Sequence, residues 1–383
     1  MKTIIGKLKK NPIFLMSLGS KELFHSNFLE FLWRVDKSKF IQMICDLTNR
    51  SCSFPSSCEM SREKENFDIC IFHENSNKYM YDLIIENKVK SIPRKDQLDN
   101  YELKAKGRGT TSFLLLSLVE HFPCKSSIPK WIIVNYHDLA ISIKKHFSSG
   151  LAPSHKQYID DYVYFIEAMH VAQEKMTDNF MSQVYFDKGI LEDLKEIRIH
   201  DLYIKLRGSM FLSDLEGKII GAAVKIMPFN KSKNSPFKYD DIRSVSTGQT
   251  NVYLECTIQQ GVGMVAAYIY KKRGVDFIYE IAIQGNQYRH GINSRALSDP
   301  NDPKLMKVWN GVRKNQYNAI FFDNIAVIGQ KNVPSLPHSN YNKYWPEYVY
   351  KYVKINCRIV SELIDSMAND INKIVQDLNN GII

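Results

Sequence analysis

Three apolar runs of strand length constrain how this chain can fold. They lie at residues 78–89 (KYMYDLIIENKV), 111–119 (TSFLLLSLV) and 130–136 (KWIIVNY). The last two runs have no polar alternation, which is typical of strands covered on both faces, as in the parallel part of a sheet. Between the first two runs, residues 94–107 (RKDQLDNYELKAKG) contain no β-branched residue and end in glycine, so they predict a helix. This order predicts an α/β fold.

The segments on either side extend this pattern. Residues 20–35 carry leucine and phenylalanine at helical spacing behind Ser20, which predicts an amphipathic helix with a serine N-cap. Residues 67–73 (FDICIFH) predict a strand that pairs with residues 78–89 through a hairpin turn, whereas the polar residues 50–64 predict a loop. Further helices are predicted at residues 158–173 and 190–206.

Beyond about residue 207 the sequence pattern changes to β-type. Gly, Asn and Lys separate successive strand-like runs, which is typical of an antiparallel meander. The chain ends in a long amphipathic helix, whose apolar stripe is expected to begin at Val353 and to end at Leu378. We therefore predict two domains, at residues 1–190 and 191–383, of which the second is a β-rich accessory domain closed by this helix. The strand-like runs lie at residues 218–229, 251–260, 263–273 and 275–284.

The charge balance indicates polyanionic partners. The chain of 383 residues has 51 Lys+Arg and 41 Asp+Glu, which gives a formal net charge of +10. Such an excess favours association with nucleic acid or with an acidic membrane surface. Lysines in the segments 228–241 and 270–273 could contact phosphates, or they could lie in solvated turns.

Cysteine usage and missing motifs exclude several classes. The 7 cysteines are scattered without a Cys-x-x-Cys pair, so neither a zinc knuckle nor a disulfide framework is expected. The absence of a Walker loop, a G-x-S-x-G elbow and an H-E-x-x-H motif argues against NTPases, serine hydrolases and zincins. With no signal peptide and no uncharged apolar run of about 18 residues, we expect a cytoplasmic protein without a membrane span.

The run at residues 78–89 ends in a charged triplet, Glu86-Asn87-Lys88. Alternate residues of a strand share a face, so Glu86 and Lys88 are expected to be neighbours. Asp68 opens the facing strand, and its carboxylate is expected near that of Glu86. Two carboxylates about 4 Å apart repel by roughly 4 kcal/mol at an effective dielectric of about 20, and a divalent cation relieves this repulsion. Such ligands suit Mg²⁺, and Lys88 could orient or deprotonate water or stabilise developing charge.

One sequence pattern resembles the motif of the PD-(D/E)XK nuclease superfamily. It consists of Asp68, a spacer, and the triplet Glu86-Asn87-Lys88 at the end of an apolar strand. The resemblance implies a restriction-endonuclease-like αβββαβ core, with a mixed sheet flanked by helices. It also implies an Mg²⁺ site, at which Mn²⁺ can substitute, with Asp68, Glu86 and Lys88 as catalytic residues. The main-chain carbonyl of Asn87 is implied as a further metal ligand. Phe67 stands where the family's motif has proline.

Two further features resemble the RecB-like and lambda-exonuclease-like branch of that superfamily. Gln97 and Tyr101 are four residues apart, on one face of the predicted helix, and match its catalytic Q-x-x-x-Y element. In this branch a glutamate of the first helix joins the metal site. Glu22 in the phrase ELFHSNFLEFL is the first candidate and Glu30 is the second. The resemblance covers about residues 20–136.

The residues and the resemblance together predict an Mg²⁺-dependent nuclease that hydrolyses phosphodiester bonds. DNA is the expected nucleic acid, and the expected role is bacterial or phage DNA processing or defence. The C-terminal region is expected to position the substrate, a protein partner or a second copy of the chain in a homo-oligomer. The alternative is a catalytically inactive nucleic-acid- or protein-binding module with the same fold. Glu86→Ala and Lys88→Ala are each expected to abolish cleavage and to leave folding nearly intact.

Each of these residues also has a structural interpretation. Glu86 and Lys88 could form an ordinary ion pair at the end of a strand. Gln97 and Tyr101 could belong to a solvated helix face. His25 could be a helix histidine with its hydrogen bonds satisfied.

Overall fold

A computed structural model describes the protein at residues 2–17, 21–49, 54–89, 91–109, 111–119, 125–227, 248–259, 262–271, 278–293, 348–355 and 357–381. Contacts divide the chain into two compact units. The N-terminal unit comprises Met1–Asp178 and Gly189–Leu206, and the C-terminal unit comprises Asn179–Lys188 and Arg207–Ile383. The domain boundary predicted at residue 190 stays a proposal.

The N-terminal unit is built on a five-stranded mixed sheet. Its strands, in their hydrogen-bonded order, are β1 (Glu59–Arg62), β2 (Ile69–Asn75), β3 (Lys78–Lys88), β4 (Ser112–Ser117) and β5 (Trp131–Asn135). β1, β2 and β3 pair antiparallel, whereas β3, β4 and β5 pair parallel. Five of the six residues of β4 are buried, as its continuous apolar run predicts. The predicted mixed sheet is confirmed.

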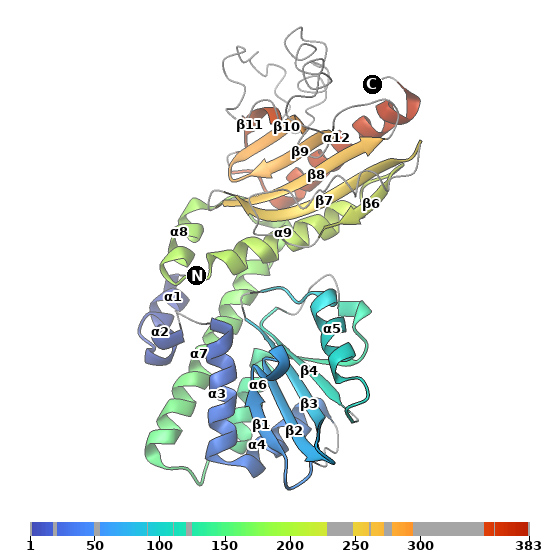
Figure 1. Ribbon diagram of the computed structural model, residues 1–383. Helices are drawn as coiled ribbons and strands as arrows, with labels where there is room; N and C mark the ends of the chain where they lie inside the picture. The colour runs from blue at the N-terminus through green and yellow to red at the C-terminus, as the bar shows by residue number, and fades with distance from the viewer. Residues whose placement is uncertain are drawn as a thin grey trace. The chain divides into compact units, whose positions relative to one another are not determined.

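Helices cover both faces of this sheet (Figure 1). α5 packs on one face through Leu98, Tyr101 and Ala105, and α3, α4 and α6 contact the strands from the other. α7 packs against α6 and against α1 and α2. The order α3, β1 to β3, α5, β4 is the predicted αβββαβ order. The helices of this unit are α1 (Lys2–Leu8), α2 (Pro12–Ser17), α3 (Lys21–Val35), α4 (Lys37–Thr48), α5 (Lys95–Ala105), α6 (Tyr136–His146), α7 (Pro153–Thr177) and α8 (Lys188–Glu196), with 3₁₀ turns η1 (Lys64–Asn66) and η2 (Lys125–Ser127). The residues of α9 (His200–Glu216) are divided between the two units, and the 3₁₀ turn η3 (Phe180–Ser182) belongs to the C-terminal unit.

The hairpin of β2 and β3 forms as its turn residues predict. Ser76 and Asn77 have φ values of 52° and 60°, the left-handed conformation that a two-residue turn of type I′ needs. The pairing shifts register between Ile71 and Phe72, which makes Asp82 an extra residue of β3. Beyond this bulge, β3 alternates regularly up to its end. The last residues of β3 therefore point in turn to the α5 face and to the α3 face.

Several elements of this unit differ from the sequence predictions. β1 lies within residues 50–64, where the sequence predicts a loop, because a short polar edge strand gives little signal. α4 and α6 were not predicted, although Asp36 and Asn135 cap them. The helix predicted at residues 190–206 is divided into α8 and α9 at Arg198, whose φ is 53°. The predicted N-cap Ser20 lies outside the described residues.

The C-terminal unit contains a six-stranded sheet and the predicted long helix. β7 to β11 pair antiparallel, but β6 pairs parallel with β7, so the predicted meander is wrong at this strand. Helix α12 packs its apolar stripe against the sheet, whereas Val353, predicted within that stripe, lies in β11. The sheet order is β11 (Tyr348–Lys354), β10 (Gln287–Asn293), β9 (Ile278–Gln284), β8 (Val262–Lys271), β7 (Thr250–Gln259) and β6 (Ala223–Ile226), and the helix is α12 (Val360–Asn380).

Gly208 lets α9 lie close to β7 inside the C-terminal unit. A Cβ atom at this position would lie 1.9 Å from the sulfur of Cys256. Because both elements belong to one apolar core, a larger residue at position 208 would force them apart.

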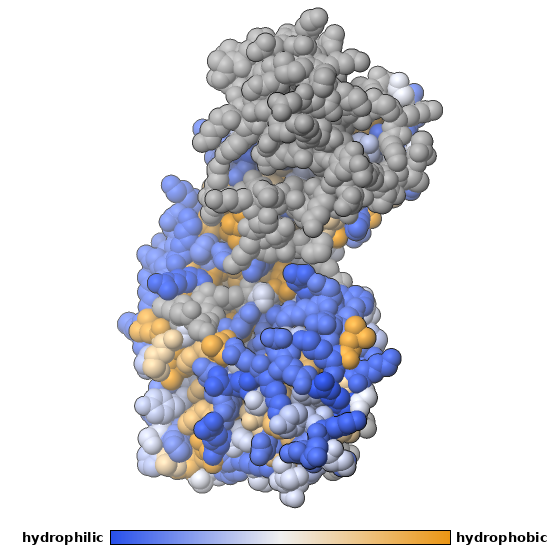
Figure 2. Space-filling view, viewed as in Figure 1, coloured by the Kyte–Doolittle hydropathy of each residue, from blue (hydrophilic) through white to orange (hydrophobic). Residues whose placement is uncertain are grey.

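The basic segments predicted from the sequence are only partly visible. Residues 228–241 lie outside the described residues, as do residues 272 and 273. Lys271 is buried and donates a hydrogen bond to the carbonyl of Leu378 at 2.8 Å, so it serves the fold. Hydrophilic side chains cover much of the N-terminal unit in Figure 2. Within the described part of the chain, no helix is both long and apolar enough to span a bilayer.

Candidate active site

Glu86, Asn87 and Lys88 end β3 in the interior of the five-stranded sheet. β3 lies between β2 and β4, and Glu86 and Lys88 pair with Leu115 and Ser117 of β4. Glu86 is fully buried, and Lys88 is 6% exposed. The charged end of this apolar strand is thus enclosed by the fold.

Asp68 immediately precedes β2 and lies next to this end of β3. Its Oδ2 accepts a hydrogen bond from the main-chain N–H of Asn87 at 2.8 Å. Its carboxyl group is also close enough to the Glu86 carboxyl group to raise the pKa of Glu86. Burial raises the pKa of Asp68, and the Asn87 N–H and the Lys88 ammonium oppose this shift. The structure therefore brings these two acids together.

The two oxygens of the Glu86 carboxyl group have different surroundings. Oε1 accepts a hydrogen bond from Gln97 Nε2 at 2.6 Å and pairs with the ammonium of Lys88. Oε2 is buried and has no hydrogen-bond donor among the residues that the structure describes. Burial raises the pKa of Glu86 to about 7, and Asp68 raises it as well, whereas Lys88 lowers it. A proton or a cation at this carboxyl group would relieve both the burial and the repulsion.

Lys88 is held as an ammonium by its neighbours. Burial lowers the pKa of Lys88, but the carboxylates of Glu86 and Glu22 outweigh this effect and the net shift is upward. A lysine with a raised pKa stays protonated at neutral pH. As an ammonium it is suited to stabilising negative charge.

Helix α5 brings Gln97 and Tyr101 to Glu86. Gln97 Nε2 donates to Glu86 Oε1 and also lies 3.2 Å from the Tyr101 hydroxyl. Tyr101 is 5% exposed, and its ring packs edge-on against Phe67 with 5.1 Å between the centroids. The two residues therefore do not form a solvated helix face. Phe67, at the position of the family's proline, fills the core beneath them.

Glu22 lies in the first turn of α3, at the edge of this cluster. Its carboxylate accepts a hydrogen bond from the hydroxyl of Ser91. It acts electrostatically on both Lys88 and Asp68, raising the pKa of each. The first candidate for the helix glutamate is therefore near the paired acids.

Two other polar residues of α3 serve the fold instead. Glu30, the second candidate, pairs with Arg34 at 2.6 Å and with Arg62 of β1. His25 is 1% exposed, with Nδ1 2.8 Å from the Tyr162 hydroxyl, while within the described residues its Nε2 has no partner. Burial lowers the pKa of His25 to about 3, so the ring is neutral. The structural interpretation of His25 expected hydrogen bonds at both ring nitrogens. In the described residues only Nδ1 has one.

Three residues around the cluster were not predicted, namely Ser26, Ser91 and Tyr136. Ser91 contacts Glu22, whereas Ser26 and Tyr136 contact the side chain of Asn87. These contacts join segments that are far apart in the chain, so no local pattern could reveal them. The only sequence signal is the place of Ser26 in the phrase ELFHS, one helical turn after Glu22.

The donor set fits a divalent metal held by two carboxylates. Asp68 and Glu86 approach each other, both have a raised pKa, and the buried Oε2 of Glu86 has no donor in the described residues. Mg²⁺ in proteins commonly takes one or two carboxylates and completes its shell with water and phosphate. The described ranges contain no group of three or more His, Cys, Asp or Glu side chains that could hold a metal. The fit therefore rests on this pair of acids.

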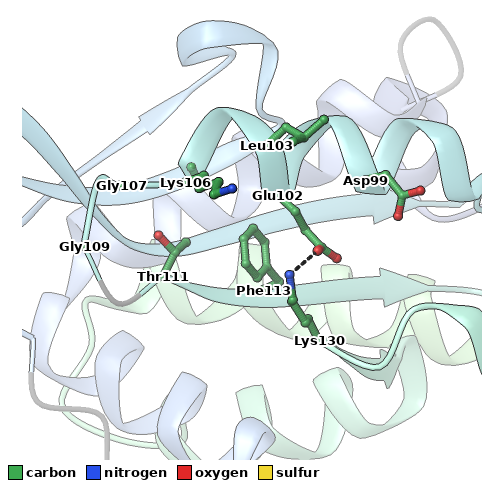
Figure 3. A pocket seen from close by; sticks show the side chains of 10 residues that line it. Asp99, Glu102, Leu103, Lys106, Gly107, Gly109, Thr111, Phe113 and Lys130 are labelled. Atoms are coloured by element: carbon green, nitrogen blue, oxygen red, sulfur yellow. Dashed lines mark hydrogen bonds and ion pairs between the residues drawn. The ribbon is translucent and has the colours of Figure 1, made fainter.

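A cavity of about 750 Å³ lies elsewhere, beside the second half of α5 (Figure 3). Figure 3 shows the ring of Phe113 beneath α5 and the Lys130 ammonium bonded to Glu102, at 2.8 Å. The predicted site residues are not among those that line it. The lining residues are Asp99, Glu102, Leu103, Ala105, Lys106, Gly107, Gly109, Thr111, Phe113 and Lys130.

Comparison with known proteins gives one match. Residues 11–164 match a family model described as the PD-(D/E)XK nuclease superfamily. The matched range contains every predicted site residue, from Glu22 to Tyr101. Neither the curated proteins nor the solved structures gave a match. The RecB-like branch stays a prediction.

Proposed function

Residues 11–164 belong to the PD-(D/E)XK nuclease superfamily, and on this premise we propose that the chain is a divalent-metal-dependent nuclease that hydrolyses phosphodiester bonds in DNA. One observation carries the proposal. Asp68 Oδ2 accepts the main-chain N–H of Asn87 at 2.8 Å, and the residues on either side of Asn87, Glu86 and Lys88, form a buried ion pair. Two acids and one cation at the end of a buried strand have no evident structural purpose, because burying charge destabilises a fold.

In this proposal Asp68, Glu86 and the main-chain carbonyl of Asn87 hold Mg²⁺, for which Mn²⁺ can substitute, and Glu22 supports them. The ion, when bound, supplies Lewis acidity at the phosphate and favours ionisation of a water molecule. Lys88 contributes a fixed positive charge where negative charge develops on the phosphate. Gln97 holds the Glu86 carboxylate in place, and Tyr101 supports Gln97.

The substrate and the setting are parts of the same proposal. The net charge of +10 favours a polyanion, and DNA is the nucleic acid that we propose. We further propose a cytoplasmic role in bacterial or phage DNA processing or in defence. The C-terminal unit would position the DNA, a protein partner or a second copy of the chain.

Cleavage assays test this proposal directly. Purified protein is incubated with linear duplex, supercoiled and single-stranded DNA and with RNA, in Mg²⁺, in Mn²⁺ or in EDTA. We expect cleavage of DNA with either metal and none in EDTA. Glu86→Gln should remove activity, whereas the matched control Glu255→Gln should keep it. Glu255 is also buried with its pKa raised to about 7, but it belongs to the C-terminal unit.

A non-cleaving binding module is the second candidate, and one observation favours it. The Lys88 ammonium and the Gln97 amide both occupy Oε1 of Glu86, so this oxygen is already satisfied without a metal. Binding to DNA or RNA that persists while no substrate is cut under any metal condition would select this alternative. Equal binding by wild type and Glu86→Gln, without cleavage by either, would strengthen it.

A further inference from the structure

The side chain of Asn87 lies on the face of β3 opposite to Glu86 and Lys88. It is fully buried, and its Nδ2 donates a hydrogen bond to Ser26 Oγ of α3 at 2.7 Å. Its Oδ1 lies 3.4 Å from the hydroxyl of Tyr136, the first residue of α6. Asn87 thus connects β3 to α3 and α6, two of the helices that cover this face.

Ser26 continues this connection to Glu22. It is 2% exposed, and its hydroxyl donates to the main-chain carbonyl of Glu22, one turn earlier in α3, at 3.4 Å. The donors and acceptors follow one direction: the Asn87 amide donates to Ser26, and Ser26 donates to Glu22. This chain of two hydrogen bonds joins the residue between Glu86 and Lys88 to the residue that carries the helix glutamate.

The same residue also orients the first acid. The main-chain N–H of Asn87 donates to Asp68 Oδ2 at 2.8 Å. Rotating or shifting the Asn87 peptide would therefore move the Asp68 carboxylate, and shifting α3 along the sheet would move Glu22. Both displacements are opposed by the Ser26–Asn87 hydrogen bond.

We propose that Ser26 and the side chain of Asn87 are positioning residues that hold Glu22 in register with Asp68 and Glu86 for binding of a divalent cation. This inference rests on the proposed metal-dependent function and adds to it a specific pair of residues behind the acids. Groups that orient metal ligands in this way commonly change metal affinity by about 10- to 100-fold when they are removed. A purely structural hydrogen bond would change stability and leave metal affinity unchanged.

A double-mutant cycle on metal binding tests the proposal without relying on activity. The variants are Ser26→Ala, Glu22→Gln and the double variant, and binding of Mn²⁺ is measured by electron paramagnetic resonance of the free ion. We expect each single substitution to weaken Mn²⁺ binding by about tenfold, and the double variant to bind no more weakly than Glu22→Gln alone. Two results would overturn the proposal. One is a loss of Mn²⁺ affinity in the double variant that equals the product of the two single losses, and the other is an unchanged Mn²⁺ affinity in Ser26→Ala.

Ser17→Ala is the matched control for loss of a buried hydroxyl. Ser17 is also 2% exposed and donates to a helix carbonyl, that of Phe14, at 2.7 Å, but it lies in α2. This variant should bind Mn²⁺ as the wild type does.

Asn87→Asp gives a second, independent route if Ser26→Ala fails to fold. It preserves the size of the side chain and removes the donor to Ser26, so the same coupling with Glu22→Gln is expected. Additive losses in that cycle would equally overturn the inference. If the wild type neither binds Mn²⁺ nor cleaves DNA, the proposed function itself fails. If the wild type does both while the variants match Ser17→Ala, only the positioning role is wrong.

Discussion

Gln97 Nε2 donates a hydrogen bond to Glu86 Oε1 at 2.6 Å, and this contact ties α5 to the central strand of the N-terminal sheet. The same oxygen pairs with Lys88, so one side of the carboxyl group receives two donors. The other oxygen, Oε2, receives none from the described residues. This asymmetry fixes the orientation of the carboxyl group and leaves one oxygen for a proton or a cation. The first two predictions follow from it.

Glu86→Gln and Lys88→Met are expected to lower DNA cleavage by at least about 100-fold with the fold intact, because each removes a charge and preserves most of the buried volume. Cleavage rates at saturating Mg²⁺ provide the measurement, with circular dichroism to confirm folding. A variant that cuts at the wild-type rate would remove its residue from the mechanism.

The alanine variants should differ from the sequence-based expectation of nearly intact folding. Every substitution at the buried Glu86–Lys88 pair leaves one charge without its partner, but alanine also removes the rest of the side chain and leaves a cavity. For the alanine variants the combined cost is expected to be about 3–5 kcal/mol of unfolding free energy. Glu86→Ala and Lys88→Ala should therefore unfold at clearly lower urea concentration than Glu86→Gln. Equal midpoints for all variants would show that the pair is not buried in solution.

The raised pKa of Glu86 predicts that the metal-free protein loses stability as the pH rises. Its pKa is about 7 in the fold and 4.5 in the reference state, so between these values the folded state binds more protons than the unfolded state. Unfolding free energy should fall by about 2–3 kcal/mol from pH 5 to pH 8 through this group. Urea unfolding in EDTA, followed by tryptophan fluorescence, measures the slope.

The control for this slope is the variant that cannot ionise. Glu255 contributes a slope of the same sign, because burial raises its pKa to about 7 as well. Only the difference between wild type and Glu86→Gln therefore isolates Glu86. Parallel pH profiles for these two proteins would contradict the assignment. Mg²⁺ should reduce the slope in the wild type, because a bound cation favours the ionised carboxylate.

The local parts of the site could be predicted from the sequence. Strand alternation places Glu86 and Lys88 on the same face of β3. Helical spacing places Gln97 and Tyr101 on the same face of α5. Both rules act within one element, so neighbouring residues determine the outcome. The continuous apolar run of β4 identified a buried strand for the same reason.

The remaining parts of the fold and of the site depend on the packing of elements that are far apart in the sequence. Glu22 and Glu30 are eight residues apart, about 12 Å along α3, and only the packing of α3 on the sheet decides which one reaches Lys88. β1 is polar and short, and it exists because β2 offers it an antiparallel partner. The partners of the Asn87 side chain lie in α3 and α6, 61 and 49 residues away. No local spacing rule predicts such contacts.

Substitution of Gln97 should change the pH dependence of cleavage. Gln97→Ala removes a donor to Glu86 and is expected to lower metal affinity or rate by about 10- to 100-fold. Gln97→Glu places a second carboxyl group beside Glu86, which should raise the pKa of Glu86 further and shift the acid limb of the pH–rate profile upward. Rates from pH 5.5 to pH 9 show the shift.

Asp99→Asn is the control on the same helix. Asp99 pairs with Lys95 at 2.5 Å near the surface, so its substitution should leave both the rate and the pH profile unchanged. If Gln97→Glu shifted the profile no more than Asp99→Asn does, the hydrogen bond to Glu86 would have no influence on its ionisation.

His25 should make the protein sensitive to acid, with a sign opposite to that of Glu86. Its pKa is lowered to about 3 by burial, against 6.5 in the reference state, so between these values the unfolded state binds the extra proton. The contribution of His25 to stability therefore falls as the pH decreases through this window, by about 2 kcal/mol at pH 5 relative to pH 7.5. His25→Asn retains a polar group near Tyr162 but cannot gain a proton. On going from pH 7.5 to pH 5, the unfolding free energy of His25→Asn should shift by about 2 kcal/mol in favour of the folded state relative to the shift in the wild type, because Glu86 and Glu255 contribute equally to both proteins. An equal shift in both proteins would mean that the buried ring does not control acid stability.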